Sequence, residues 1–408
     1  MRNAMLLTLF YAVAAAMFAI SHMYGGFGAW FLFCASLLFA LYETLAWRSL
    51  RRTFEVSRRV SAGRLQAGQD VTVDIDLKIT DSAWTPVQWL RVEDVLPTKL
   101  AVRSDEPYRV VYPWGRKEFS VQYRLTDTPR GLYRLHAVAV SGGDVFGLLI
   151  LRVEVHNSTQ LVVYPRVRKI AYWSAVDQRR LGNRVAQSRS VADATRVIGT
   201  REYIPGDRLS RIHWLATART GTLRSKEFEH YALNELLFIL DTSYESFGRF
   251  PSSFELALST VASLAEYAHR IRIVFGYYAF GTSVHHVPPK QGDLTLLRML
   301  EHLAVAEADG QASFPEGLWR LLSVPRQSTA VVVTRGVTDG LLRFAVLAAD
   351  RQLRVQLLLA RAEQSSLTPE EDALAERLRL FGWQIRTLHS LDSLDTLGSG
   401  GSSYAGHA

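Results

Sequence analysis

The sequence has only one cysteine, Cys34, among its 408 residues. A single cysteine excludes an intrachain disulfide and a metal site built from several thiolates. The motifs of common hydrolases are missing as well: there is no Gly-x-Ser-x-Gly, no Cys-His pair and no His-Glu-x-x-His. A glycine-rich phosphate loop is also absent, which argues against a nucleotide site. The sequence therefore specifies no recognised catalytic constellation.

Charged residues are absent from two stretches near the N-terminus, 4–20 and 29–42. With its flanking residues, the second stretch approaches the roughly 20 residues that a helix needs to cross a bilayer. The first stretch has no small-x-small cleavage site followed by polar chain, and a second apolar run follows at once, which argues against a signal peptide. We therefore predict a transmembrane hairpin over residues 1–47.

The distribution of arginine predicts how this hairpin is oriented. Six arginines and one acid, Glu55, lie between Arg48 and Arg64, whereas the link 21–28 has no lysine or arginine. Because basic residues favour the cytoplasmic side, we expect a two-pass protein of the inner (plasma) membrane with both termini in the cytoplasm.

Residues 53–165 alternate between apolar and polar with a period of two. The alternation predicts strands at 71–79, 118–125, 132–140 and 151–156, separated by glycine-rich turns. Short strands at this spacing, with no helical pattern between them, favour an antiparallel β-sandwich of the immunoglobulin-like kind.

Residues 234–390 show a different pattern, in which apolar strands alternate with helices. The run 235–241 is continuously apolar between Glu235 and Asp241 at its ends, and 253–270 has helical periodicity. Such alternation predicts an α/β domain with a doubly wound parallel sheet. His285 and His286 are expected in a surface loop, and residues 391–408 in a disordered tail rich in glycine and serine.

A candidate metal site follows the first strand of this α/β domain. Asp241 and Ser243 form the Asp-x-Ser that opens a von Willebrand A-type site, in which alternate oxygen ligands share Mg²⁺. The third ligand position is Glu245 rather than serine, the expected threonine falls on Ala312, and Arg335 stands where an acid belongs. We therefore predict no cofactor, with Mg²⁺ as the one candidate.

Between the two patterned regions lies a basic segment, 166–233, which is predicted to be a linker. Residues 166–230 hold fourteen lysines and arginines against six acids. Within this segment we predict a turn at 204–207, a helix at 211–220 and a strand at 221–229. Two interpretations stay open. Trp214 is buried in an ordered connector, with Asp207 paired to Arg211 or Arg219, or this segment is a docking surface for a partner.

These residues resemble a bacterial family known as domain of unknown function 58. The resemblance rests on a signature that stands here as Arg201, Tyr203, Pro205-Gly206-Asp207, Arg211, Ile212, Trp214, Ala218-Arg219-Thr220, Leu223 and Lys226-Glu227-Phe228-Glu229. Weaker matches are 129–133, 143–149 and 162–165. The resemblance implies a membrane-anchored protein with a von Willebrand A-like domain, associated with MoxR-type AAA ATPases and transglutaminase-like membrane proteins. It implies no catalytic residues.

Three functions are compatible with these observations. The first is a non-enzymatic adaptor whose cytoplasmic head binds a protein partner, in particular a AAA ATPase. The second is a hydrolase or transferase with a site near Asp207, His213 and Asp241. The third is an envelope structural protein that binds anionic lipid through the basic segment. Nucleic acid is not an expected partner, because the basic residues are scattered and no known nucleic-acid module is visible.

Overall fold

The computed structural model describes residues 2–50, 54–80, 89–113, 116–174, 197–204, 212–228, 235–311, 314 and 328–398. The chain divides into two compact units, Met1–Tyr164 and Pro165–Ala408. Ala312, where the metal pattern expects a threonine, lies outside the described residues.

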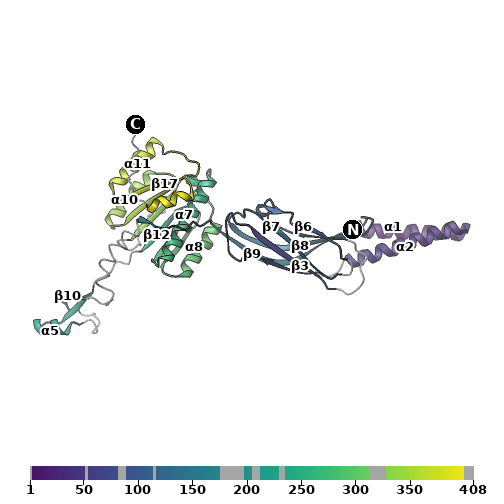
Figure 1. The fold of residues 1–408 in the computed structure, drawn as a ribbon, viewed down its shortest axis with the longest axis horizontal. Coiled ribbons are helices and arrows are strands. Elements are labelled where there is room, and N and C mark those ends of the chain that lie inside the picture. The colour runs from purple at the N-terminus through teal and green to yellow at the C-terminus, as the bar shows by residue number, and fades with distance from the viewer. Residues whose placement is uncertain are drawn as a thin grey trace. The chain divides into compact units, whose positions relative to one another are not determined.

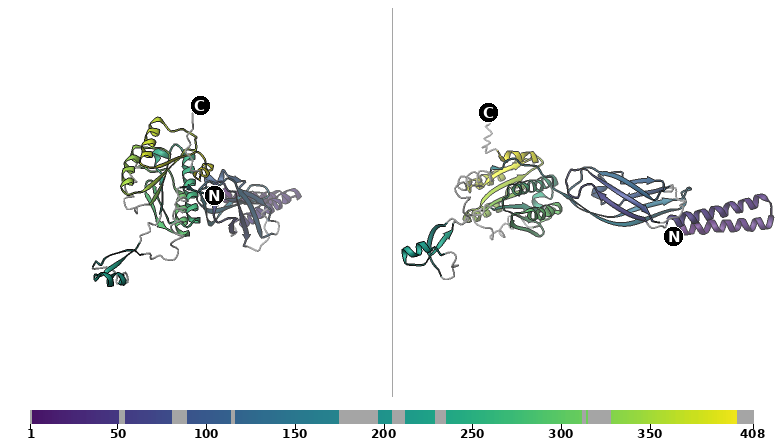
Figure 2. Two further views of the ribbon diagram at one scale, coloured as in Figure 1. Left: turned by 60° about the vertical axis from the view of Figure 1, so that its left-hand side comes forward. Right: turned by 60° about the horizontal axis from the view of Figure 1, so that its bottom comes forward.

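The first unit begins with two long helices, α1 (Arg2–Tyr24) and α2 (Phe27–Leu50). They pair as a hairpin, with the rings of Phe10 and Phe39 5.1 Å apart, and Figure 2 shows them lying side by side. Gly25 and Gly26 make the turn with φ of 62° and 93°, values that glycine adopts without strain. Both helices are long and apolar enough to cross a membrane, which confirms the predicted lengths, while their orientation stays a prediction.

Among the described residues of the first unit, nine strands form two sheets that enclose one hydrophobic core. The strands predicted at 71–79 and 118–125 have the observed bounds. The strands predicted at 132–140 and 151–156 are parts of longer strands. One sheet has the order β1 (Phe54–Val60), β3 (Val71–Ile79), β7 (Glu118–Leu125) and β5 (Ser104–Asp105). The other has the order β2 (Leu65–Gln66), β9 (Ile150–Tyr164), β8 (Gly131–Gly143), β4 (Trp89–Asp94) and β6 (Tyr108–Val111), and a short helix, α3 (Thr98–Ala101), follows β4 in the chain.

A completely buried ion pair crosses this core. Arg58 of β1 donates from Nε and Nη2 to the two carboxylate oxygens of Asp94 on β4, at 3.0 and 2.6 Å. Its guanidinium also donates to the backbone carbonyls of Leu135, Ala137 and Asn157. The Tyr123 hydroxyl donates to Asp94 at 2.6 Å, and burial together with the charge of Asp94 raises the pKa of Tyr123. The pair thereby links strands of both sheets.

The second unit contains a six-stranded sheet in which five neighbouring strands are parallel and the edge strand β14 is antiparallel. This confirms the predicted doubly wound parallel sheet. The spatial order is β14 (Val284–Lys290), β13 (Phe275–Phe280), β12 (Leu236–Asp241), β15 (Thr329–Thr334), β16 (Arg354–Ala360) and β17 (Gln384–Leu388). The chain winds one way from β12 and then the other, so the direction of winding reverses between β12 and β15.

Helices cover both faces of this sheet (Figure 1). Alternate residues of β12 explain why: Phe238 packs on one face and Ile239 on the other, and both are fully buried. One face carries α7 (Pro251–Arg270) and α8 (Asp293–Val305), and the other carries α10 (Asp339–Asp350) and α11 (Pro369–Leu380). Thr368 caps α11 in the predicted box with Glu371.

Three segments differ from the sequence-based expectations. His285 and His286 belong to strand β14 rather than to a loop, because the strand pairs with β13 and buries alternate side chains. Residues 391–398 form a 3₁₀ helix, η3 (Leu391–Gly398), whose Leu394 and Leu397 are fully buried, so the ordered fold extends beyond 390. The start of the predicted linker also packs into the core of the second unit, where Ile170 and Trp173 are buried.

Candidate functional site

The sheet order of the second unit selects one place where a ligand is expected. In open α/β sheets, ligands bind beyond the carboxyl ends of the strands, at the point where the strand order reverses. Here that point lies between the ends of β12 and β15, which are Asp241 and Thr334. The two side chains meet, since the Thr334 hydroxyl donates to Asp241 Oδ2 at 2.7 Å.

Asp241 is fully buried, and its carboxylate is occupied by local hydrogen bonds. The backbone N–H of Ser243 donates to Oδ1 at 2.9 Å, while Thr334 donates to Oδ2. Burial raises the pKa of Asp241, and hydrogen bonds from Ser246, Thr334 and Ser243 oppose that shift. This arrangement fits an aspartate that fixes the loop after β12 and joins it to β15.

The other two predicted metal ligands differ in how far they are exposed to solvent. Ser243 is buried at the start of the short helix α6 (Tyr244–Phe247), and its hydroxyl donates to Ser246 Oγ at 3.1 Å. Glu245 lies on α6 and is exposed. Among the described residues, no group of three histidine, cysteine, aspartate or glutamate side chains is placed to hold a metal ion. Of the predicted ligands, the described part of the site therefore offers the Asp241 carboxylate and the Ser243 hydroxyl, while the Glu245 carboxylate is exposed on α6.

Arg335 occupies the position where a metal-binding loop of this kind carries an acid. Its guanidinium carbon lies 3.2 Å from the centroid of the Phe250 ring. Burial and the charge of Arg361 lower the pKa of Arg335, while Glu363 and Glu371 act in the opposite direction. Arg361 also donates to the backbone carbonyl of Arg335 at 2.9 Å. The positive charge of Arg335 would repel a metal cation at this position, and Glu363 and Glu371 offset part of that charge.

The signature residues form a separate small element, which we call the signature module and define as residues 197–204 and 212–228. Two antiparallel strands, β10 (Val197–Glu202) and β11 (Arg224–Phe228), are paired, and helix α5 (Trp214–Thr220) lies between them in the chain. Gly221 ends α5 with φ of 71°, in the left-handed region that favours glycine. The predicted helix and strand are therefore confirmed, and β10 is an element that sequence reasoning missed.

Large apolar side chains of the signature module are exposed. Trp214 is 67% exposed and Leu215 is 62% exposed, so the interpretation that buries Trp214 in a connector is wrong. Ile204 and Leu223 are also exposed, at 59% and 47%. Ile212 is buried and holds the module together through a bridge to Ser225. Exposed aromatic and aliphatic side chains gathered in one small element are typical of an interaction surface.

The remaining signature positions divide by whether the structure describes them. Gly206, Asp207 and Arg211 lie outside the described residues, as does the side chain of Arg201, so their pairing stays a prediction. Arg219 is exposed on α5, and Thr220 donates to the Ala216 carbonyl at 2.9 Å. The backbone of Tyr203 donates to the Leu223 carbonyl at 2.9 Å, which joins the two ends of the module.

His213, which the enzyme hypothesis uses, has a local structural role. It is the N-cap of α5, and its Nδ1 accepts a hydrogen bond from the backbone N–H of Ala216 at 3.1 Å. A capping side chain satisfies one of the free N–H groups at a helix start. Asp241 has its own partners at the end of β12, so among the described residues His213 and Asp241 are not joined by any hydrogen bond.

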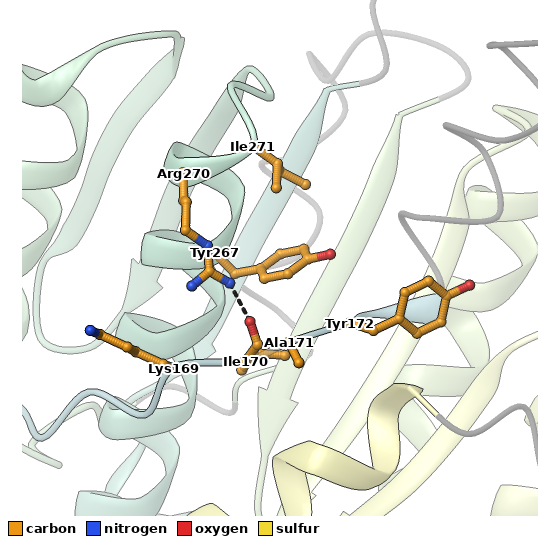
Figure 3. Close-up of a pocket in the computed structure, with 7 residues that line it drawn as sticks. All are labelled: Lys169, Ile170, Ala171, Tyr172, Tyr267, Arg270 and Ile271. Carbon is orange, nitrogen blue, oxygen red and sulfur yellow. Dashed lines mark hydrogen bonds between the residues drawn. The ribbon is translucent and has the colours of Figure 1, made fainter.

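A shallow cavity of about 470 Å³ opens in the second unit near the start of β13. Lys169, Tyr172, Tyr267 and Arg270 line it, and Figure 3 shows Arg270 donating to the Ile170 carbonyl. Because Arg270 ends α7 and precedes β13, this cavity lies at the amino ends of the strands, opposite to Asp241. The Arg270 guanidinium also lies over the Tyr267 ring. The residues that line the cavity thus attach segment 165–174 to α7.

Burial lowers the pKa of both histidines of β14, His285 and His286. His285 stacks on His302 of α8, with ring centroids 3.9 Å apart. Burial, and then the neighbouring His286, lower the pKa of His285. An unfolded histidine titrates near about 6.5, so below that pH the unfolded chain binds the proton more readily than the folded one. The contribution to stability is complete above about pH 6.5 and is lost as the pH falls toward the folded pKa.

We expect His285→Phe to reduce the loss of thermal stability when the pH is lowered from 7.5 to 5.5. The unfolding midpoint of the purified full-length protein at the two pH values is the measurement, and His156→Phe, at an exposed histidine on β9, is the control. A midpoint that falls equally in His285→Phe and the unmodified protein would contradict this prediction.

Comparison with known proteins places the chain among bacterial relatives. A family model described as "Protein of unknown function DUF58" matches residues 199–369. The uncharacterized protein YeaD of Bacillus subtilis strain 168 is 30% identical over 374 residues, which is 90% of this chain and 90% of that protein. Among solved structures, proximal thread matrix protein 1 from the mussel byssus covers 40% of this chain and 45% of its own, with 15% identity and a TM-score of 0.31. The CARDB domain of the PF1109 protein from Pyrococcus furiosus covers 28% of this chain and 88% of its own, with 14% identity and a TM-score of 0.18.

Proposed function

Because this chain belongs to the DUF58 family of proteins of unknown function, we propose that it is a membrane-anchored, non-enzymatic adaptor that binds a protein partner. The observation that carries the proposal is the exposed apolar surface of the signature module, made by Ile204, Trp214, Leu215 and Leu223. Tryptophan is the side chain most enriched at the energetic centres of protein interfaces, because it buries a large area at little conformational cost.

The partner we propose is a MoxR-type AAA ATPase, as the family resemblance implies. In this proposal the second unit is a von Willebrand A-like domain with a degenerate metal site, and the two sheets of the first unit form an immunoglobulin-like sandwich. Both interpretations agree with the strand order of the parallel sheet and with the core that the two sheets share. The local hydrogen bonds of Asp241 and the presence of Arg335 support a mode of binding that needs no metal ion.

The anchor we propose is the helix hairpin α1–α2, which places the two sheets of the first unit and the whole second unit in the cytoplasm. Its support is the length and apolar character of both helices, together with the arginines that follow α2. The surplus of positive charge between 166 and 230 would then lie near an anionic inner leaflet. An adaptor fixed in this way holds its partner at the membrane surface.

We expect the double substitution Trp214→Ser, Leu215→Ser to abolish retention of a AAA ATPase in a pull-down of the full-length protein from detergent-solubilised native membranes. Removal of two large apolar side chains from the centre of an interface costs well over 10-fold in affinity, since each such residue contributes about 2 kcal/mol or more. The measurement is the amount of ATPase identified in the eluate by mass spectrometry.

The matched control replaces another exposed adjacent pair, Leu380 and Phe381 at the end of α11, which are 88% and 46% exposed. Leu380→Ser, Phe381→Ser should retain the ATPase at the level of the unmodified protein. Retention of the ATPase by the signature variant, or loss from both variants alike, would overturn the docking surface. Absence of any ATPase from the unmodified protein would overturn the proposed partner.

A further inference from the structure

The connection between β8 and β9, residues 144–149, is a loop fixed by hydrogen bonds to a buried acid of its own. Asp144 is buried, and its carboxylate accepts backbone hydrogen bonds from Phe146 at 2.8 Å and from Leu149 at 2.7 Å. Leu149 is fully buried, and its carbonyl accepts from the backbone N–H of Asp144 at 3.2 Å. The polar groups of the loop thus bond to one another.

The outer surface of the same loop is apolar. Val145 is 50% exposed, Phe146 is 59% exposed and Leu148 is 39% exposed. Turn residues that face water are ordinarily polar, because a solvated loop gains nothing from large apolar side chains. A loop that buries its acid and displays its hydrophobic side chains is suited to an apolar environment.

This loop lies against helix α2. The ring of Phe146 is 5.1 Å from that of Phe39 and 5.9 Å from that of Tyr42, centroid to centroid. The backbone N–H of Val145 donates to the Tyr42 hydroxyl at 3.3 Å. At the base of the loop, Asn3 of α1 donates to the Ile150 carbonyl at 2.9 Å. Both helices therefore contact the β8–β9 hairpin.

The residues of α2 that the loop contacts indicate how deep the loop lies relative to the proposed membrane. Tyr42 is the last residue of the uncharged stretch 29–42, and Phe39 lies three residues, or about 4.5 Å, deeper in this stretch. Around this level α2 presents exposed leucines, among them Leu38 at 67% and Leu41 at 45%. The acid that follows, Glu43, is buried. The surface at this depth therefore consists of apolar side chains from α2 and from the loop.

We propose that residues 145–148 insert into the cytoplasmic leaflet of the bilayer beside α2, as a third membrane contact in addition to the two helices. This inference rests on the proposed anchoring by α1 and α2. Lipid acyl chains are the occupant that the observations favour, because the apolar surface of the loop is continuous with the lipid-facing surface of α2. Insertion of the loop would fix the tilt of the two sheets of the first unit relative to the membrane.

The test measures the depth of single fluorescent labels in the full-length protein. In a Cys34→Ser background, Phe146→Cys, Leu148→Cys, Leu38→Cys and Leu132→Cys are each labelled with a nitrobenzoxadiazole maleimide. Leu132 is 42% exposed at the opposite end of β8 and is the matched control for an exposed apolar position away from the loop. The proteins are reconstituted in vesicles of phosphatidylethanolamine and phosphatidylglycerol, with and without lipid that carries a nitroxide on its acyl chain.

We expect labels at 146 and 148 to lose fluorescence to the nitroxide to an extent comparable to the label at 38, and the label at 132 to lose none. Quenching at 38 without quenching at 146 or 148 overturns the inserted loop and leaves the anchor intact. Absence of quenching at 38 overturns the anchor and, with it, the insertion. The use of two reporter positions in the loop separates insertion from a local disturbance caused by one substitution.

Discussion

Replacing Asp94 by alanine is expected to lower the free energy of unfolding of the two-sheet unit by about 3–5 kcal/mol. The substitution leaves the Arg58 guanidinium buried without its counter-charge, and it leaves the Tyr123 hydroxyl without the acceptor that it uses. Both side chains of the ion pair are completely buried, so water cannot replace the lost carboxylate. The measurement is hydrogen exchange of the backbone amides of β3 and β8 in the full-length protein.

The neighbouring ion pair supplies a matched control. Arg59, the next residue of β1, pairs with Asp76 of β3, and the Arg59 side chain is 73% exposed. Asp76→Ala should change the free energy of unfolding by about 1 kcal/mol or less, because exposed ion pairs contribute little. Equal effects of the two substitutions would show that burial does not determine how much stability is lost when the Arg58–Asp94 pair is broken.

A double replacement separates the charge from the packing. Arg58→Met combined with Asp94→Leu removes both charges and keeps apolar volume, and buried pairs replaced in this way are often as stable as the original. We therefore expect the double variant to recover most of the stability that Asp94→Ala loses. If the double variant is as unstable as Asp94→Ala, the hydrogen bonds from Arg58 to the backbone carbonyls contribute more to stability than its pairing with Asp94.

Replacing Trp173 by alanine is expected to destabilise the second unit by about 3–5 kcal/mol. The Trp173 ring is fully buried against Phe238, with centroids 6.5 Å apart, and against Tyr267, at 6.1 Å. Its Nε1 donates to Gln356 Oε1 of β16 at 2.9 Å, and Gln356 is itself buried. The substitution thus creates a cavity and leaves a buried amide oxygen without this donor.

The preceding residue is the control for this prediction. Tyr172 is 38% exposed, so Tyr172→Ala should change stability by a fraction of a kcal/mol, as surface substitutions do. Hydrogen exchange of the amides of β12 and β16 in the full-length protein is the measurement. A small effect of Trp173→Ala would mean that residues 165–174 are an attached linker and not a part of the core of the second unit.

Regular patterns along the chain were enough to predict most of the elements. The alternation in 71–79 and 118–125 predicts strands with their observed bounds, because one buried face imposes a period of two on consecutive residues. The uncharged stretches predict both long helices, and the alternation of strands and helices after 234 predicts the parallel sheet. Each of these features is decided by neighbours in the chain.

The candidate site was predictable only in part. The apolar run 235–241 predicts the strand that ends at Asp241, where this side chain meets Thr334, and the signature segment predicts α5 and β11. The exposure of Trp214 and the strand β10 were not predictable, since short segments of mixed composition carry no clear period. The β8–β9 loop belongs to a weaker match of the family signature, and its apolar residues gain a meaning only from their contact with α2.

Two comparisons show why the tertiary structure decides the rest. Arg58 and Arg59 are adjacent among the arginines that predict the cytoplasmic side of the hairpin. Nevertheless, Arg58 is buried with Asp94 and Arg59 is exposed. Trp173 and Trp214 both lie in the basic segment, yet the first is fully buried and the second is 67% exposed. Local sequence predicted the helix that carries Trp214 and the basic character of both segments. Burial depends on surfaces contributed by residues far away in the chain, and a local pattern does not contain them.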